Sequence, residues 1–341
     1  DLRNTVLPIG AAVGGMLIPA AIYLSFNAGT EEVVGWAIPM ATDIAFALGV
    51  VSLLGSRVPS SVKVFLTTLA IVDDLGAVIV IALFYTSEIS VVNVLLGLGF
   101  LLLMFVGNKL GVKNLFFYAL LGIAGVWVCF LLSGVHATIA AVLAAMTIPA
   151  DSEIDENTFL HRVRKLTRRF DKAESNDVRT LEKEQVEILA HIQKDTTTAI
   201  PPLQLMEHHL NPIVTFIVLP VFAFANAGVN LVDIDWSAVF AANITIGVAL
   251  GLLLGKPLGV VGVSWLLSKL GIAKTPADMS NRQLLGLGFL ASIGFTMSMF
   301  VSTLAFQTEM MLTQAKIGIF MASILGGLIG YKLLKSSSNK N

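Results

Sequence analysis

The sequence of 341 residues contains little charge and almost no cysteine. Charged residues make up 13% of the chain and apolar residues 55%, whereas a soluble domain carries about a quarter charged residues. The mean hydropathy is +0.82. The single cysteine, Cys129, excludes a disulfide framework and a cysteine-based metal site. The sequence also lacks the alternating pattern of a membrane β-barrel and any signal-peptide pattern.

The low charge and the missing barrel pattern predict an all-α polytopic membrane protein. Helices are expected because lipid offers unpaired backbone groups no hydrogen-bond partner. Each span should be a helix of about 20 apolar residues. Ten apolar runs meet this description, at about 6–26, 34–54, 62–85, 91–107, 115–132, 134–149, 212–230, 239–267, 284–306 and 315–334. The fifth and sixth runs are short and meet at Ser133-Gly134, so we expect two tilted or partial helices that share one turn.

Composition divides the chain into three segments. Residues 1–150 contain membrane helices with a first triplet of spans at about 6–85, and residues 207–341 contain membrane helices with a second triplet at about 239–334. Residues 151–206 are polar and highly charged, and we interpret them as a partly helical cytoplasmic insert, either a solvated segment or a regulatory surface that binds a partner. If the N-terminus is cytoplasmic, the loops on the opposite side of the membrane hold a single basic residue, Lys316. The positive-inside rule therefore places both termini in the cytoplasm.

Few charged residues fall inside the predicted spans. They are Asp43, Asp73, Asp74 and Lys256, with Glu207 near the mouth of a span. An ion at the bilayer centre costs at least about 2.5 kcal/mol, so such residues are functional candidates.

Asp73 and Asp74 are adjacent in an apolar run, and neighbouring helix positions point about 100° apart. One acid can therefore face Lys256, while the other faces an aqueous funnel. Two close acids titrate as a coupled pair, and carboxylate oxygens suit a small hard cation. A proton and a cation would compete for this pair. Such competition couples two fluxes if the site faces one side of the membrane at a time.

Two spans carry interruptions at membrane depth. Pro39 precedes Thr42-Asp43 by one turn in the second span, and Ser292-Ile-Gly294 lies at the middle of the ninth. Each is the second member of its triplet, and the two triplets have opposite topology. The pattern predicts an inverted-repeat transporter with two crossing interrupted helices at the bilayer midplane. Helix ends of like sign would meet there, and Asp43 and Lys256 supply the compensating charges.

Several motifs surround these residues. They are Ala41-Thr-Asp-Ile-Ala-Phe-Ala-Leu-Gly-Val50, Ala70-Ile-Val-Asp-Asp-Leu-Gly-Ala77, Ser133-Gly-Val-His-Ala-Thr138, Leu219-Pro-Val-Phe-Ala-Phe-Ala-Asn-Ala-Gly228, Gly255-Lys-Pro-Leu-Gly259 and Ile293-Gly-Phe-Thr-Met-Ser298. Together they resemble the NhaA-type sodium/proton antiporters over nearly the whole chain apart from the insert. That family is itself a known case of the inverted-repeat architecture, so the two predictions are not independent.

The resemblance implies a secondary active transporter, not an enzyme, that exchanges sodium or lithium for protons across the bacterial inner membrane. Asp74 would be the principal cation and proton carboxylate, with Asp73 beside it as a second sodium ligand and paired with Lys256 in the ion-free state. Protons would leave from the two acids, or from one acid and Lys256. Either route lets one sodium exchange for more than one proton, so transport would be electrogenic.

Other roles are carried over from the same resemblance. Thr42 and Asp43 would line the site where the interrupted helices cross, and Glu207 and His208 would sense pH at the cytoplasmic mouth. The implied partners are sodium or lithium, protons and the lipid bilayer, with no cofactor and no nucleic acid.

The chain also departs from the family pattern. It should lack the first two helices of the family's twelve, including a hairpin that forms dimers, which leaves a homodimer as an open expectation. Ser292 occupies a position where glycine is expected, and Asn211 one where a second histidine is frequent.

Two other functions compete with the antiporter interpretation. A sodium-coupled solute symporter of related fold would need room for an organic solute. An intramembrane aspartyl protease would use Asp43 and Asp73 as a pair that shares one proton. The sequence has no Gly-x-Gly-Asp context, and Lys256 would keep one of the acids ionised, so the protease is the weaker alternative.

Overall fold

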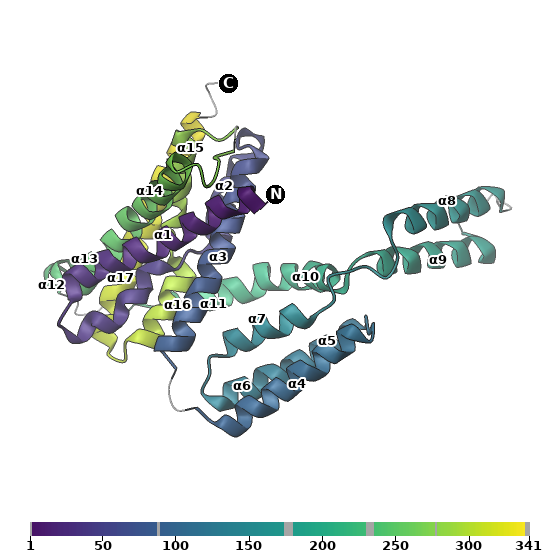
Figure 1. The fold of residues 1–341 in the computed structure, drawn as a ribbon, viewed down its shortest axis with the longest axis horizontal. Helices are drawn as coiled ribbons and strands as arrows, with labels where there is room; N and C mark the ends of the chain where they lie inside the picture. The colour runs from purple at the N-terminus through teal and green to yellow at the C-terminus, as the bar shows by residue number, and fades with distance from the viewer. Residues whose placement is uncertain (1, 87–88, 174–179, 230–234, 277, 338–341) are drawn as a thin grey trace. The chain divides into compact units, whose positions relative to one another are not determined.

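The computed structural model describes residues 2–86, 89–173, 180–229, 235–276 and 278–337, with side chains except those of residues 2–4 and 56. These residues form helices and no strands (Figure 1), which confirms the all-α prediction. Across the same residues, eight helices are long and apolar enough to cross a membrane, or nine if one bent pair is a single span. The protein is therefore an integral membrane protein.

The helices form two compact units that do not follow the linear segments of the sequence. The first unit comprises residues 1–85 and 221–341, and the second comprises residues 86–220. Both predicted triplets belong to the first unit, so residues far apart in the chain build one structure.

The first unit contains two sets of three spans. In the first set, α1 (Leu2–Asn27) is followed by an interrupted span, which consists of the 3₁₀ helix η1 (Glu31–Met40) and α2 (Ile44–Leu53), and then by α3 (Ser60–Phe84). In the second set, after the short α12 (Trp236–Ala241), α13 (Asn243–Leu250) and α14 (Lys256–Lys269) form one span through a π-helical turn (Gly251–Gly255). The bent pair α15 (Asn281–Ala291) and α16 (Phe295–Ala305) follows, and α17 (Glu309–Ser337) ends the set.

The second unit contains the remaining spans. They are α4 (Val91–Lys109), the continuous run of α5 (Leu115–Leu120), a π-helical segment (Leu121–Trp127) and α6 (Val128–Ser133), and α10 (Pro202–Ile213). A second π-helical segment (Val214–Val218) joins α10 to α11 (Leu219–Ala227), so this span begins at Pro202 and runs beyond the unit boundary. Met104, Tyr118, Val126 and Phe130 form the apolar core of the unit.

The sixth predicted span, 134–149, is shorter than expected. Its helix, α7 (Ala137–Thr147), has 11 residues, which at 1.5 Å per residue falls short of a hydrocarbon core about 30 Å thick. The sequence explains why: Gly134 adopts φ 83° and ends α6, and Ile148-Pro149 is extended at the other end. The expectation of a partial helix is met here, whereas a full crossing is not.

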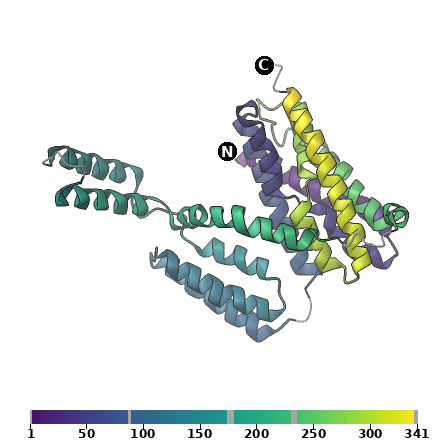
Figure 2. The same ribbon diagram turned by 180° about the vertical axis from the view of Figure 1, so that it is seen from behind.

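The insert contains a helical hairpin. In both views of the ribbon, α8 (Glu156–Lys172) and α9 (Lys183–Ala199) lie side by side (Figures 1 and 2). Asp155 caps α8, and hydrogen bonds from the hydroxyl and the backbone N–H of Thr158 hold the pKa of its carboxyl below its usual range. The backbone N–H of Glu153 donates to Thr198 O (3.1 Å), and that of Leu203 to Pro149 O (3.2 Å), so the base of the hairpin is closed.

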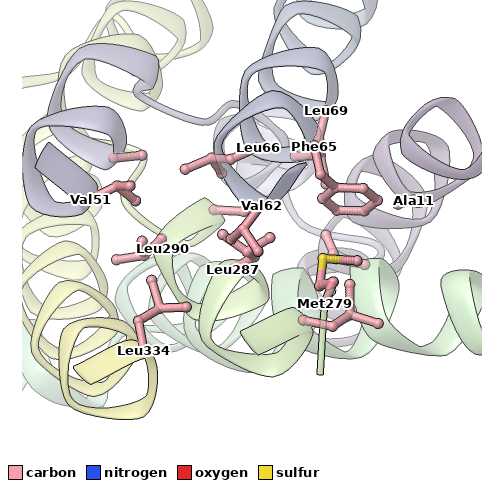
Figure 3. Packing of buried hydrophobic residues seen from close by; sticks show 14 of the residues in the cluster. Ala11, Val51, Val62, Phe65, Leu66, Leu69, Met279, Leu287, Leu290 and Leu334 are labelled. Carbon is pink, nitrogen blue, oxygen red and sulfur yellow. The ribbon is translucent and has the colours of Figure 1, made fainter. Parts of the chain in front are cut away.

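Apolar packing connects the two sets of spans in the first unit. Figure 3 shows side chains of α3, including Phe65, Leu66 and Leu69, close to Leu287 and Leu290 of α15. All five are almost completely buried. This cluster holds α3, the helix that carries the two adjacent acids, against the second set of spans.

Glycines let α1 and α14 approach each other closely. A Cβ atom on Gly259 would lie 2.2 Å from the backbone oxygen of Gly14, and one on Gly14 would lie 2.6 Å from the oxygen of Gly259. Small residues at such crossings permit backbone contact between membrane helices. The position of α14 therefore depends on these two glycines.

Replacing Gly259 tests this contact. In Gly259→Ala the new methyl group meets backbone, which cannot rotate away, so we expect destabilisation of about 1–3 kcal/mol and a clearly lower Tm in detergent. Gly262→Ala on the same helix is the matched control, because a Cβ there meets nothing within 4 Å. Equal Tm values for the two variants would contradict the close crossing.

Candidate functional site

A buried ion pair joins α3 to α14. Lys256 Nζ lies 2.6 Å from Asp73 Oδ2, and both side chains are 0% exposed. The ammonium group also donates to the carbonyl oxygen of Met40, at the end of η1. A buried charge is tolerated only when it is paired and hydrogen-bonded, and Lys256 has both kinds of partner.

Glycines and prolines bring Lys256 to this position. A Cβ on Gly255 would lie 2.8 Å from Pro19 Cα, and one on Gly251 would lie 2.9 Å from Pro39 Cβ. The π-helical turn before Lys256 thus packs directly on α1 and on the last turn of η1. Lys256 is the first residue of α14, and its side chain reaches the carbonyl end of η1. The partial negative charge at that helix end favours a cation.

Asp43 caps the beginnings of two different helices. Its Oδ1 accepts the backbone N–H of Phe46 in α2 (3.1 Å), and its Oδ2 accepts the backbone N–H (3.0 Å) and the hydroxyl (2.5 Å) of Thr296 in α16. Asp43 is 2% exposed. Its negative charge therefore faces two positive helix ends in a buried place.

The two interrupted helices also exchange hydrogen bonds at their breaks. The backbone N–H of Asp43 donates to Ile293 O (2.6 Å), and the Thr42 hydroxyl donates to Ala291 O (2.9 Å). Each break thus supplies partners that the other lost when its helix stopped, which is the condition for irregular backbone at membrane depth. These contacts show that the two interruptions meet.

Asp74 differs from its neighbour. It is half-buried, and it interacts electrostatically with Asp73, Lys256 and Asp43. Within the part of the chain that the structure describes, its buried Oδ1 has no hydrogen-bond partner, and the same holds for Oδ1 of Asp73. Two adjacent carboxylates thus each present an unsatisfied oxygen, as expected of groups that bind a proton or a cation.

The predicted break residues lie in or beside the interruptions. Pro39 is in the last turn of η1, and Ser292 and Gly294 lie between α15 and α16. The Ser292 hydroxyl donates to Phe289 O (2.6 Å), so this hydroxyl satisfies a carbonyl near the end of α15.

The two candidate pH-sensing residues are not part of this cluster. Glu207 and His208 lie on α10 in the second unit, and both are exposed.

Two participants escaped sequence reasoning. Thr296 binds Asp43 through its backbone and its side chain, and the carbonyl of Met40 accepts from Lys256. The hydroxyl-rich middle of the ninth span was the signal for Thr296. A backbone carbonyl leaves no signal in the residue type, so only the structure identifies Met40.

The geometry argues against the protease alternative. Asp43 is occupied by the two helix ends, and Asp73 is paired with Lys256. An aspartyl protease needs two acids that share one proton, which these separate partnerships do not provide.

Comparison of the sequence with known proteins shows which family it resembles. The family model for Na⁺/H⁺ antiporter 1 matches residues 1–334. The chain is 46% identical over 336 residues to Na⁺/H⁺ antiporter NhaA 1 of Psychromonas ingrahamii, covering 98% of this chain and 76% of that protein. It is 46% identical over 338 residues to NhaA 2 of Syntrophotalea carbinolica, covering 99% and 77%. It is 42% identical over 343 residues to NhaA 1 of Clostridium beijerinckii, covering 100% of this chain and 75% of that protein. All three relatives are named as transporters.

The Asp73–Lys256 pair predicts a nonadditive response to mutation. Lys256→Met leaves a buried carboxylate without its partner, so we expect a loss of about 3–5 kcal/mol, whereas Asp73→Asn/Lys256→Met should recover most of it. Thermal unfolding in detergent measures both. Lys269→Met, at the last position of the same helix, is the control and should lower the Tm far less, because it removes only an exposed contact with the Trp265 ring. If Lys256→Met were as stable as this control, the ion pair would not hold the two helices together.

Proposed function

The chain belongs to the Na⁺/H⁺ antiporter 1 family, and from this premise we propose that it exchanges sodium for protons. The single observation in the structure that best supports the proposal is the pair of adjacent, buried carboxylate oxygens on Asp73 and Asp74 that have no hydrogen-bond partner in the described residues. Such oxygens bind either a proton or a small cation, and the two ligands compete.

In this mechanism Asp74 is the main exchanging carboxylate. It is half-buried, whereas Asp73 beside it is fully buried. Sodium, the transported substrate, would bind Asp74 with a contribution from Asp73, and protons held by the two acids, or by one acid and Lys256, would be released as it binds. Lys256 balances Asp73 when sodium is absent, because their separation of 2.6 Å favours both charged forms.

The meeting of the two interruptions supplies the fixed surroundings of the site. Asp43 and Thr42 hold the two breaks together, and Lys256 reaches the end of η1. Half-helices that are separated by short breaks of this kind can tilt relative to each other. We propose that this freedom lets the carboxylates face one side of the membrane at a time.

Regulation and stoichiometry are further parts of the proposal. Exposed Glu207 and His208 on α10 are candidates for pH sensing, because both side chains are ionisable and in contact with solvent. More than one proton per sodium would make transport electrogenic, and lithium is a second cation that carboxylates of this kind accept.

The proposed location is the bacterial inner membrane. The excess of Lys and Arg in alternate loops supports cytoplasmic N- and C-termini. Homodimerisation remains a proposal carried from the family resemblance.

Neutralising Asp74 is the direct test of the proposed function. Sodium added to proteoliposomes that contain the parent chain should change the internal pH, and Asp74→Asn should reduce this signal to that of protein-free liposomes. Glu309→Gln, an exposed acid at the start of α17, is the matched control and should retain transport. Exchange that survives in Asp74→Asn would rule out this carboxylate as the exchanging group.

Competition between the two ions gives a second test. If sodium and protons share the site, lowering the pH should raise the apparent KM for sodium several-fold and leave the maximal rate much less affected. Initial rates over a sodium series at several pH values measure this. A KM that does not change with pH, together with a falling maximal rate, would favour separate binding sites.

A further inference from the structure

The outer face of α8 carries a concentration of positive charge that the exchange mechanism does not use. The helix has six basic residues, Arg162, Arg164, Lys165, Arg168, Arg169 and Lys172, and two acidic ones, Glu156 and Asp171. All six basic side chains are exposed.

The positive charge is spread over two sides of the helix. Successive residues turn by about 100°, which places Arg164, Arg168 and Lys172 opposite the apolar residues Phe159, Val163, Leu166 and Phe170. Arg162 and Arg169 lie instead on the flank toward α9, where they meet its acidic residues. These four apolar side chains are half-buried, on the side of α8 that packs on α9. Because its apolar side is already covered, α8 presents mainly its basic side to the surroundings.

Much of this charge is uncompensated within the hairpin. Arg162 lies 3.3 Å from Asp195, and Arg169 lies 3.6 Å from Glu184, which links α8 to α9. Over the described ranges of the chain, Arg164, Arg168 and Lys172 form no ion pair. Calculated helix positions put these three on one stripe, since they are spaced by four residues.

The hairpin is also tethered next to the membrane. α7 ends at Thr147 and the span that begins with α10 starts at Pro202, and hydrogen bonds close the base of the insert between these points. Short connections thus join both ends of the hairpin to helices of the membrane region.

We propose that the basic face of α8, defined by Arg164, Arg168 and Lys172, docks on anionic phospholipid head groups. Positively charged segments beside a membrane are attracted to an anionic leaflet, and this attraction is screened by salt. α9 carries three acidic and two basic residues, so it lacks this excess of positive charge. Binding of the hairpin would thus depend on the charge of the lipid surface and not on ion exchange.

Fluorescence depth measurements on the full chain test this proposal. With Cys129→Ser as background, one label is placed at His161→Cys within the basic face, and another at Ala190→Cys on the outer side of α9; both positions are exposed. The chain is reconstituted in phosphatidylcholine vesicles with or without phosphatidylglycerol, together with a quencher attached to the lipid head group. Both leaflets contain the same lipids, so the orientation of the protein does not affect the result.

The expected result is several-fold stronger quenching at His161→Cys in the anionic vesicles than in the neutral ones, with little change at Ala190→Cys. Added salt should remove the difference, and Arg164→Gln/Arg168→Gln/Lys172→Gln should weaken it. Lys183→Gln/Lys194→Gln, which removes charge from α9, should leave it unchanged.

Three results would overturn the proposal. One is quenching that does not depend on phosphatidylglycerol, and another is equal quenching at both labels. The third is protection of the label at His161→Cys from the quencher that depends on the density of protein in the vesicles and not on lipid charge. That result would assign the basic face to a second copy of the chain. None of these readouts requires transport, so the outcome is separate from that of the proposed function.

Discussion

The structure of the first unit depends on one constraint, which is that charges and unpaired backbone groups inside a membrane must find partners within the protein. Lys256 has Asp73 and the carbonyl of Met40, and Asp43 has the beginnings of α2 and α16. Each of these side chains connects segments that are distant in sequence. The same contacts that satisfy the charges therefore also fix where the two interruptions meet.

Packing makes these partnerships geometrically possible. Lys256 reaches η1 because Gly251 and Gly255 allow the turn before it to lie against Pro39 and Pro19. Farther along α14, Gly259 contacts the backbone of Gly14. The glycines have no chemical role in exchange, yet they set the distance over which the ion pair forms. A methyl group at one of these crossings should thus affect the site without touching a charged atom.

The second unit has a different character. Its apolar core is built around α4 and the span that contains α5 and α6, and its insert presents a basic helix at the surface. Asp73 and Asp74, which carry the proposed exchange chemistry, belong to the first unit, whereas Glu207, His208 and the basic face of α8 belong to the second. This division separates the groups proposed to bind the transported ions from those proposed to respond to pH and to lipid.

The sequence by itself determined the all-α membrane class, the positions of nearly all spans and the small set of charged residues worth examining. It could do so because ions and unpaired backbone amides are costly in lipid. Membrane spans are therefore long apolar helices, which the hydropathy of the sequence reveals. The sixth run is among the predicted spans, whereas Gly134 and Pro149 limit its helix to 11 residues. Only the tertiary structure decided that Thr296 and the carbonyl of Met40 complete the site, and that Asp73 rather than Asp74 contacts Lys256. Those outcomes depend on which faces of distant helices meet, and packing settles that, not the local pattern of residues.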